Sequence, residues 1–173
     1  MARTTVGGMP FELPDNLHPN CGPVAWMLGT WAGNGRGDYP TIEPFQYGQE
    51  LVFQQDGRPF LHYFSRSWIV DEQGQTVRQA AQETGFLRCR PERGHVELLL
   101  THHTGFAEIW YGEAADGKLD LTTDAVVRTE SAKEVTGGKR LYGNVEGDLL
   151  YAYDMAAVGQ DLQPHTWARL QRA

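Results

Sequence analysis

Six histidines are the side chains in this sequence best suited to ligate a metal ion or to transfer a proton. His102 and His103 are adjacent, so on a strand they point to opposite faces and cannot share a metal ion. No HxH or HExxH motif and no histidine–carboxylate cluster stands out, which argues against a zinc hydrolase. His165 follows Pro164 and opens an apolar final segment that contains Trp167. A histidine in such a setting is either a ligand or a hydrogen-bonded core residue, and the sequence leaves both interpretations open.

The densest local pattern is the glycine-rich segment Gly29-Thr-Trp-Ala-Gly-Asn-Gly35. It lacks the preceding apolar strand and the following helix that a dinucleotide-binding site requires. Gly33, Gly35 and Gly37 alternate, so on a strand they share one face, and this face carries no side chains. Such a face permits sharp bending of the strand or close approach of a flat ligand. No GxSxG nucleophile motif is present, and the two cysteines, Cys21 and Cys89, form no CxxC motif, so we expect two free thiols.

The elements that must position these residues are predicted to be strands. Twenty glycines and nine prolines divide the chain into short segments rich in Val, Thr, Tyr, Phe and Trp. Turn dipeptides separate many of them: Asp56-Gly57, Asp116-Gly117, Gly137-Gly138 and Gly147-Asp148. The predicted strands are Thr30–Gly37, Phe45–Gln54, Phe60–Val70, Thr84–Cys89, His95–Thr101, Phe106–Tyr111, Lys118–Thr122, Ala125–Glu130, Arg140–Val145, Asp148–Met155 and His165–Arg172. Only Gly22–Leu28 is predicted to be helical, for one or two turns before Gly29.

These elements predict an all-β protein, a roughly ten-stranded antiparallel up-and-down β-barrel with a short N-terminal helical turn. A meander of this length avoids exposed edges most simply by closing on itself. A barrel of about ten strands is wider than side chains alone fill, so we expect an internal ligand cavity. Residues 21–173 are predicted to form this single domain. Residues 1–20, with Pro10, Pro14 and Pro19, are predicted to be a loosely ordered lead-in.

Composition excludes several classes of protein. The chain has 173 residues, of which 40% are hydrophobic, and this is enough to form one folded domain. Its formal net charge of −7 and the lack of a basic cluster argue against binding to nucleic acid or to a membrane surface. No apolar run approaches the roughly 20 residues of a membrane helix, and the N-terminus has no apolar signal-peptide region. The sequence therefore predicts a soluble, cytoplasmic protein.

Several segments in a fixed order resemble the nitrobindins, small haem-binding β-barrels with a lipocalin-like or fatty-acid-binding-protein-like shape. The resemblance extends from about residue 22 to Arg172. Its pieces are Gly29–Gly35, Gly37-Asp-Tyr-Pro-Thr-Ile-Glu-Pro-Phe45, Arg58-Pro-Phe-Leu-His-Tyr63, Glu83-Thr-Gly-Phe-Leu-Arg88, Ser131-Ala-Lys-Glu-Val-Thr136 and Tyr153-Asp-Met-Ala-Ala-Val-Gly159 with Leu162-Gln-Pro-His165.

The resemblance implies a ferric haem b in the barrel mouth with His165 as the axial iron ligand. It also implies that the protein binds nitric oxide and is a peroxynitrite isomerase that produces nitrate, and that it is a possible homodimer. Besides His165, the residues it assigns to cofactor binding are Thr41, Lys133, Gly29, Trp31, Gly33 and Gly35. Thr41 could equally be an ordinary strand residue, and Lys133 a solvated surface charge. Ala80 and Ala81 stand where many members have a Met-His pair, so a distal histidine is not expected there.

Strand parity raises one structural condition. It places His165 on one face with Trp167, Arg169 and Gln171, and that face becomes polar. We therefore expect a bulge or a strand end after Trp167.

Two alternative functions remain open. One is a carrier or sensor barrel that holds haem or another flat apolar molecule without turnover. The other is a lipocalin-like barrel that binds an apolar ligand without a metal.

Overall fold

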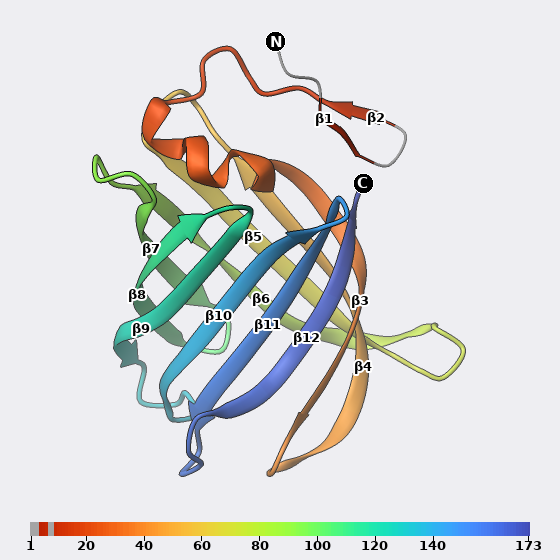
Figure 1. Cartoon of the computed structure of the whole chain (residues 1–173). Coiled ribbons are helices and arrows are strands. Elements are labelled where there is room, and N and C mark those ends of the chain that lie inside the picture. Colours follow the sequence, from red (N-terminus) through yellow and green to blue (C-terminus); the bar gives the residue numbers. More distant parts are fainter. Residues whose placement is uncertain (1–3, 7–8) are drawn as a thin grey trace.

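Ten strands form a closed barrel in the computed structural model, which describes residues 4–6 and 9–173. Figure 1 shows these strands wrapped around one interior. The strands are β3 (Gly29–Tyr39), β4 (Ile42–Gln54), β5 (Phe60–Val70), β6 (Thr76–Cys89), β7 (His95–His102), β8 (Phe106–Ala115), β9 (Lys118–Arg128), β10 (Val135–Val145), β11 (Asp148–Ala157) and β12 (Gln163–Arg172).

Each barrel strand pairs antiparallel with the strands that precede and follow it in the chain. The last strand, β12, then pairs with the first, β3, through partners such as Leu170 with Gly33 and Thr166 with Gly37. This final pairing closes the barrel and leaves it without an edge strand. The predicted all-β, up-and-down β-barrel is confirmed.

The two ends of the barrel differ. Because the strands alternate in direction, loops 40–41, 71–75, 103–105, 129–134 and 158–162 all lie at one end, which we call the mouth. The 3₁₀ helix η1 (Pro19–Met27) lies across the other end, which we call the capped end (Figure 1). His18 caps η1 by accepting a hydrogen bond from the Asn20 backbone N–H at 3.2 Å. The fully buried Trp31 donates from its indole Nε1 to the Met27 carbonyl at 2.8 Å and so connects η1 to β3.

Side chains alternate between the interior and solvent along each strand. In β5, Leu61, Tyr63 and Ser65 are buried inside the barrel, whereas Phe60 and His62 on the other face are partly exposed. The apolar core therefore fills the interior from η1 toward the mouth.

Several details of the sequence-based strand assignment are wrong; β6, for example, begins at Thr76 rather than at Thr84. The segments Lys118–Thr122 and Ala125–Glu130 belong to one strand, β9, because a bulge opposite Ile109 and Trp110 continues the pairing with β8. The dipeptide Gly137-Gly138 is not a turn but lies within β10. A Cβ on Gly138 would meet the Asp154 carbonyl and the Tyr153 ring, each at 2.8 Å, so this glycine permits close packing rather than chain reversal. Asp116-Gly117 does form a tight turn, since both residues have positive φ.

The N-terminal segment contains a short ribbon. Strands β1 (Thr4–Val6) and β2 (Met9–Phe11) pair antiparallel, and η1 begins at Pro19. The parts of the predicted lead-in at residues 1–3 and 7–8 lie outside the described residues.

Candidate functional site

His165 occupies a β-bulge at the mouth. Tyr153 of β11 pairs with Thr166, but its neighbour Asp154 pairs with Pro164, so His165 is the extra residue between them. After this bulge the inward positions of β12 are Thr166, Ala168 and Leu170 instead of those in phase with His165. The expected irregularity exists, but it precedes Thr166 rather than following Trp167, which is 44% exposed on the outer surface.

The bulge places the His165 ring among aromatic side chains of the mouth. The ring centroid lies 5.3 Å from that of Tyr39, 5.9 Å from Tyr153 and 6.2 Å from Phe45, with edge-on geometry in each case. These neighbours come from β3, β11 and β4. The imidazole is therefore half-buried in an apolar environment.

A backbone carbonyl orients the imidazole. His165 Nδ1 lies 2.9 Å from the Asp38 carbonyl oxygen, which only accepts, so Nδ1 carries the hydrogen. Burial lowers the pKa of His165 from its ordinary value, although the Asp38 carbonyl opposes this effect. The ring is thus neutral at pH 7, and the lone pair of Nε2 is left to bind a metal.

A small apolar cluster lines the mouth beside His165. Its buried members are Tyr39, Val135 and Ala157, and the partly buried Phe106, Val126 and Met155 pack against them. The Tyr39 hydroxyl donates to the Met155 carbonyl and accepts from the Ala157 N–H, both at 3.0 Å. These two bonds fix Tyr39, and with it one wall of the His165 environment.

Two predicted polar contacts lie on the rim of the mouth. Thr41 is exposed in the turn between β3 and β4. Lys133 is exposed in the loop between β9 and β10, two residues before the buried Val135. Both belong to mouth loops, so the fold brings them to the same barrel end as His165.

The glycines of β3 face inward, and backbone and aromatic side chains of adjacent strands lie against them. A Cβ on Gly35 would meet the Tyr47 ring and the Trp167 carbonyl, each at 2.5 Å, and a Cβ on Gly37 would meet the Phe45 ring. A Cβ on Gly33 would meet the backbone of β12. Gly35 and Gly37 therefore give the rings of Tyr47 and Phe45 room against β3.

The structure does not bring Gly29 and Trp31 together with His165. Gly37 pairs with Thr166 next to His165, whereas Trp31 is six residues away, or about 20 Å along the strand. Trp31 contacts η1 at the capped end, and Gly29 lies beside Arg172.

A charged cluster that sequence analysis missed is buried behind the mouth. Glu83 of β6 accepts two hydrogen bonds from Arg140 of β10, at 2.6 and 2.8 Å, and one from the Tyr63 hydroxyl at 2.6 Å. His102 of β7 lies between two carboxylates, with Nδ1 3.2 Å from Glu83 and Nε2 2.7 Å from Glu108. The guanidinium of Arg140 also lies 4.8 Å from the centre of the Tyr153 ring. We call Glu83, His102, Glu108 and Arg140 the charged cluster.

Mutual pairing keeps Glu83 and Arg140 ionised. Burial alone would raise the pKa of Glu83, but Arg140, His102 and the Tyr63 hydroxyl hold it at about 2. Burial would likewise lower the pKa of Arg140, yet Glu83 raises it above its ordinary value. Burial raises the pKa of Tyr153, so its hydroxyl stays protonated between Arg140 and His165.

Strand parity could have identified the charged cluster. His102 continues the inward series Val96, Leu98 and Leu100 on β7. Arg140 has the same parity as the buried Tyr142 on β10. Because Ala80 and Ala81 occupy β6, no histidine is present at the positions where many nitrobindins have a Met-His pair. A different strand, β7, supplies the buried His102.

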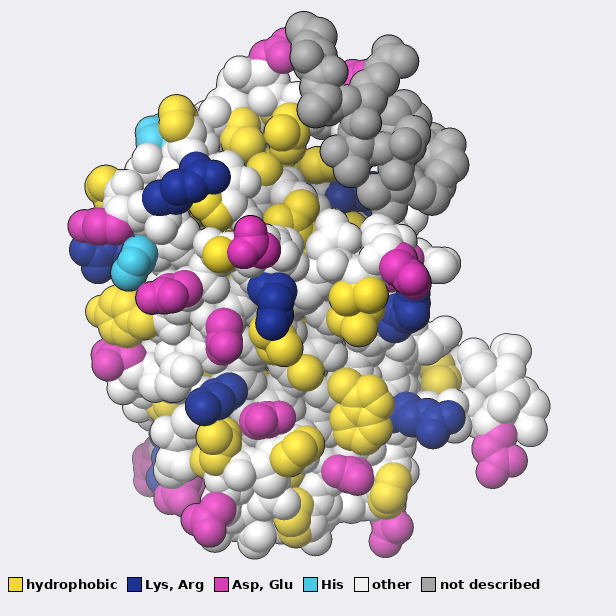
Figure 2. Space-filling model, viewed as in Figure 1, with side chains coloured by type: hydrophobic (Ala, Val, Ile, Leu, Met, Phe, Trp, Pro, Cys, Tyr) yellow, Lys and Arg dark blue, Asp and Glu magenta, His cyan; other side chains and the backbone are white. Residues whose placement is uncertain are grey.

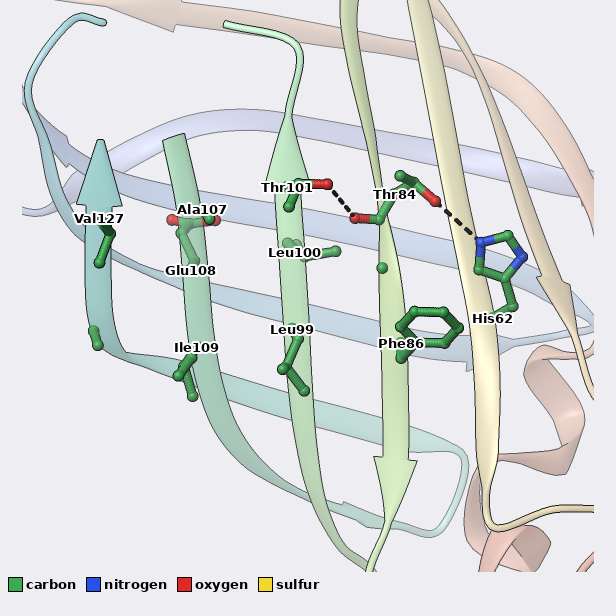
Figure 3. A pocket seen from close by; sticks show the side chains of 12 residues that line it. His62, Thr84, Phe86, Leu99, Leu100, Thr101, Ala107, Glu108, Ile109 and Val127 are labelled. Atoms are coloured by element: carbon green, nitrogen blue, oxygen red, sulfur yellow. Dashed lines mark hydrogen bonds between the residues drawn. The ribbon is translucent and has the colours of Figure 1, made fainter. Parts of the chain in front are cut away.

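An apolar groove of about 460 Å³ lies on the outside of the barrel, across β5 to β9. Its lining includes Phe86, Leu99, Ile109 and Val127, all exposed (Figure 3). His62 and Thr84 border it through a hydrogen bond of 3.1 Å. The histidine of this groove, His62, is bound to Thr84 and is not surrounded by aromatic rings of the barrel interior, as His165 is. We therefore place the candidate site at the mouth.

Lysine and arginine side chains alternate with carboxylates on the face in Figure 2 and form no basic stripe. In the described part of the chain, no group of three or more His, Cys, Asp or Glu side chains is arranged to hold a metal ion. No described helix is long and apolar enough to span a membrane.

The residues at the mouth fit a haem. A haem iron needs one fixed, neutral nitrogen ligand, and the porphyrin needs apolar walls with polar groups at the entrance for its carboxylates. His165 offers Nε2 with Nδ1 bound to a carbonyl. Tyr39, Phe45 and Tyr153 provide the walls, and Lys133 lies on the rim.

Comparisons with known proteins point to the same group. The model of a family described as "THAP4-like, heme-binding beta-barrel domain" matches residues 20–172. A protein of Nocardioides sp. named peroxynitrite isomerase is 82% identical over 164 residues, which are 95% of this chain and 99% of that protein. A ferric nitrobindin-like protein of Streptomyces griseus is 44% identical over 93% of this chain and 85% of its own length. The crystal structure of Rv2717c from M. tuberculosis superposes with a TM-score of 0.81 at 38% identity and covers 91% of this chain and 99% of that one.

Proposed function

Because the chain belongs to the family of THAP4-like, heme-binding β-barrel domains, we propose that it holds a ferric haem b in the mouth and isomerises peroxynitrite to nitrate. It also binds nitric oxide at the same iron. The observation that carries this proposal is the bulged His165, whose Nε2 is left without a proton by the bond from Nδ1 to the Asp38 carbonyl.

His165 is the proposed axial ligand of the iron. Its Asp38 bond selects the tautomer and fixes the ring orientation, as the second partner of a metal-bound histidine does in general. Tyr39 and Phe45 pack edge-on against the ring and limit its rotation. Thr41 and Lys133, both exposed in loops of the mouth, are the proposed contacts of the haem carboxylates. Gly35 contributes indirectly by giving Tyr47 room on β3, and Gly33 by letting β12 approach closely.

When bound, ferric iron supplies a Lewis acid that polarises the peroxo oxygen of peroxynitrite. The side chains of the chain provide the environment for this step. The apolar mouth cluster of Tyr39, Val135 and Ala157 would limit access of water to a ligand bound there, which favours isomerisation over reaction with water. The Tyr39 hydroxyl is engaged by two backbone partners and offers no free proton to the ligand.

The alternative is a carrier or sensor that binds haem without turnover. Ferric haem titration and peroxynitrite kinetics separate the two functions. The isomerase proposal expects a Soret band at one haem per chain and a faster loss of peroxynitrite, with nitrate as product, at substoichiometric holoprotein. A Soret band without this acceleration would establish a carrier or sensor, and an unchanged haem spectrum would refute both.

The proposed partners are the small molecules nitric oxide and peroxynitrite. The net charge of −7 and the mixed charges on the face in Figure 2 support the absence of nucleic-acid or membrane-surface binding. The free thiols of Cys21 and Cys89 support a reducing, cytoplasmic location. A homodimer stays a prediction, and sedimentation equilibrium of the holoprotein tests it.

A further inference from the structure

Both ring nitrogens of His102 face carboxyl groups, Nδ1 that of Glu83 and Nε2 that of Glu108. If both carboxyl groups are ionised they only accept hydrogen bonds, and His102 has to donate two protons. A neutral imidazole has a single N–H and can satisfy only one of them. The side chains of Glu108 and Glu83 are 0% and 10% exposed, so water cannot readily replace the missing bond.

Charge balance leads to the same conclusion. With Arg140 positive and both carboxylates negative, the charged cluster has a net charge of −1 when His102 is neutral and of zero when it is protonated. Isolated charge is costly to bury, so the cluster favours the protonated form. Three further polar groups contact the cluster without changing its charge: the Tyr63 hydroxyl donates to Glu83, the Trp110 indole donates to Glu108, and the Tyr142 hydroxyl accepts from Arg140.

The cluster lies across the barrel from His165. Strand β7, which carries His102, is five strands away from β12 in either direction around the ten-stranded barrel. The His102 ring stacks on Phe106 with centroids 3.8 Å apart, and Phe106 packs in the mouth cluster with Tyr39. Phe106 therefore connects His102 to the apolar cluster beside His165.

We propose that His102 carries the titrating proton of the charged cluster, and that its protonation raises the affinity of the mouth for anionic ligands such as peroxynitrite. The inference rests on the proposed function for its ligand class. Loss of the proton leaves one uncompensated negative charge behind Phe106, and this charge repels an incoming anion. For scale, one unit charge on the order of 10 Å from a bound anion changes its affinity by roughly tenfold at the effective dielectric constant of a protein.

The first test uses the wild-type apoprotein and needs no haem. Nitrogen-15 NMR of the imidazole rings reports how many nitrogens of His102 carry a hydrogen. The proposal expects both to be protonated at pH 7, and a titration then gives the pH at which one proton leaves. A single protonated nitrogen at pH 7, with the proton on Glu108 instead, would overturn the proposal.

The second test measures azide binding to the ferric holoprotein between pH 5.5 and 9. In the wild type, azide affinity should fall roughly tenfold over the pH range in which NMR shows His102 losing its proton. His102→Gln should bind azide weakly throughout this range, because its cluster always has a net charge of −1. Glu108→Gln should bind azide well and without this pH dependence, because its cluster is neutral without a proton on His102. His103→Gln, which alters the exposed neighbour, is the matched control and should behave as the wild type.

The two tests separate the possible failures. The same azide pH profile in all four proteins would overturn the role of His102 while leaving haem binding intact. Failure to form a Soret band would instead refute the proposed function, and the NMR result would still decide the protonation of His102.

Discussion

Replacing Arg140 by methionine removes the only arginine that pairs with Glu83 among the described residues. Arg140 is 2% exposed and makes two charge-assisted bonds to Glu83, at 2.6 and 2.8 Å. Methionine keeps much of the volume but leaves a buried carboxylate uncompensated. Breaking a buried ion pair in this way costs about 3–5 kcal/mol of unfolding free energy. For a domain of this size, we expect the melting temperature to fall by about 6–20 °C.

The assay is urea unfolding of the apoprotein at pH 7, with calorimetry for the melting temperature. Arg169→Met is the matched control, because Arg169 pairs with Asp148 at 2.5 Å but is 55% exposed. An exposed pair contributes at most about 1 kcal/mol, so this variant should remain close to the wild type.

The double variant Glu83→Gln/Arg140→Met distinguishes lost pairing from lost packing. It removes both charges, and it should recover part of the stability lost in Arg140→Met. If Arg140→Met is no less stable than Arg169→Met, Arg140 does not balance buried charge, and our account of the charged cluster is refuted.

Three further predictions concern the pH dependence and the packing of the barrel. Haem affinity should fall on acidification only as the pH passes below the lowered pKa of His165, because a proton then competes for Nε2; a Soret titration from pH 8 to 5 measures this, and stronger binding in acid would contradict it. The pKa of Glu83 is held at about 2, below the ordinary 4.5, so ionised Glu83 stabilises the folded protein fully above pH 4.5. On the order of 3 kcal/mol of unfolding free energy is lost as the pH falls toward 2. Urea unfolding midpoints should show this pH dependence, and Glu83→Gln should lack it. Gly85→Ala should cost about 1–3 kcal/mol, since its Cβ would collide with the Leu99 carbonyl, whereas Gly143→Ala meets nothing within 4 Å and should be neutral in the same assay.

The fold could be predicted because its signals are local. Alternating apolar residues and turn dipeptides such as Asp116-Gly117 define strands and reversals within a few residues, and ten such strands have to bury their edges. Bulges were harder to predict, because they depend on the partner strand. The break predicted near Thr123 is a bulge in β9, and Gly137-Gly138 serves close packing against Tyr153 instead of turning the chain.

The site was predicted in part. A resemblance could indicate His165, but the Asp38 carbonyl that orients it becomes its neighbour only when β12 closes against β3. The charged cluster joins residues from β6, β7, β8 and β10, and no sequence spacing reports this proximity. Strand parity could have marked His102 and Arg140 as inward-facing, because each continues the buried series of its strand.

Ligation of iron by His165 is tested most directly by removing its imidazole and returning it from solution. His165→Gly should lose the Soret band of the reconstituted wild type, and added imidazole should restore it by occupying the vacated position beside Asp38 and Tyr39. His103→Gly should keep the wild-type spectrum without imidazole. A wild-type Soret band in His165→Gly without added imidazole would contradict ligation by His165.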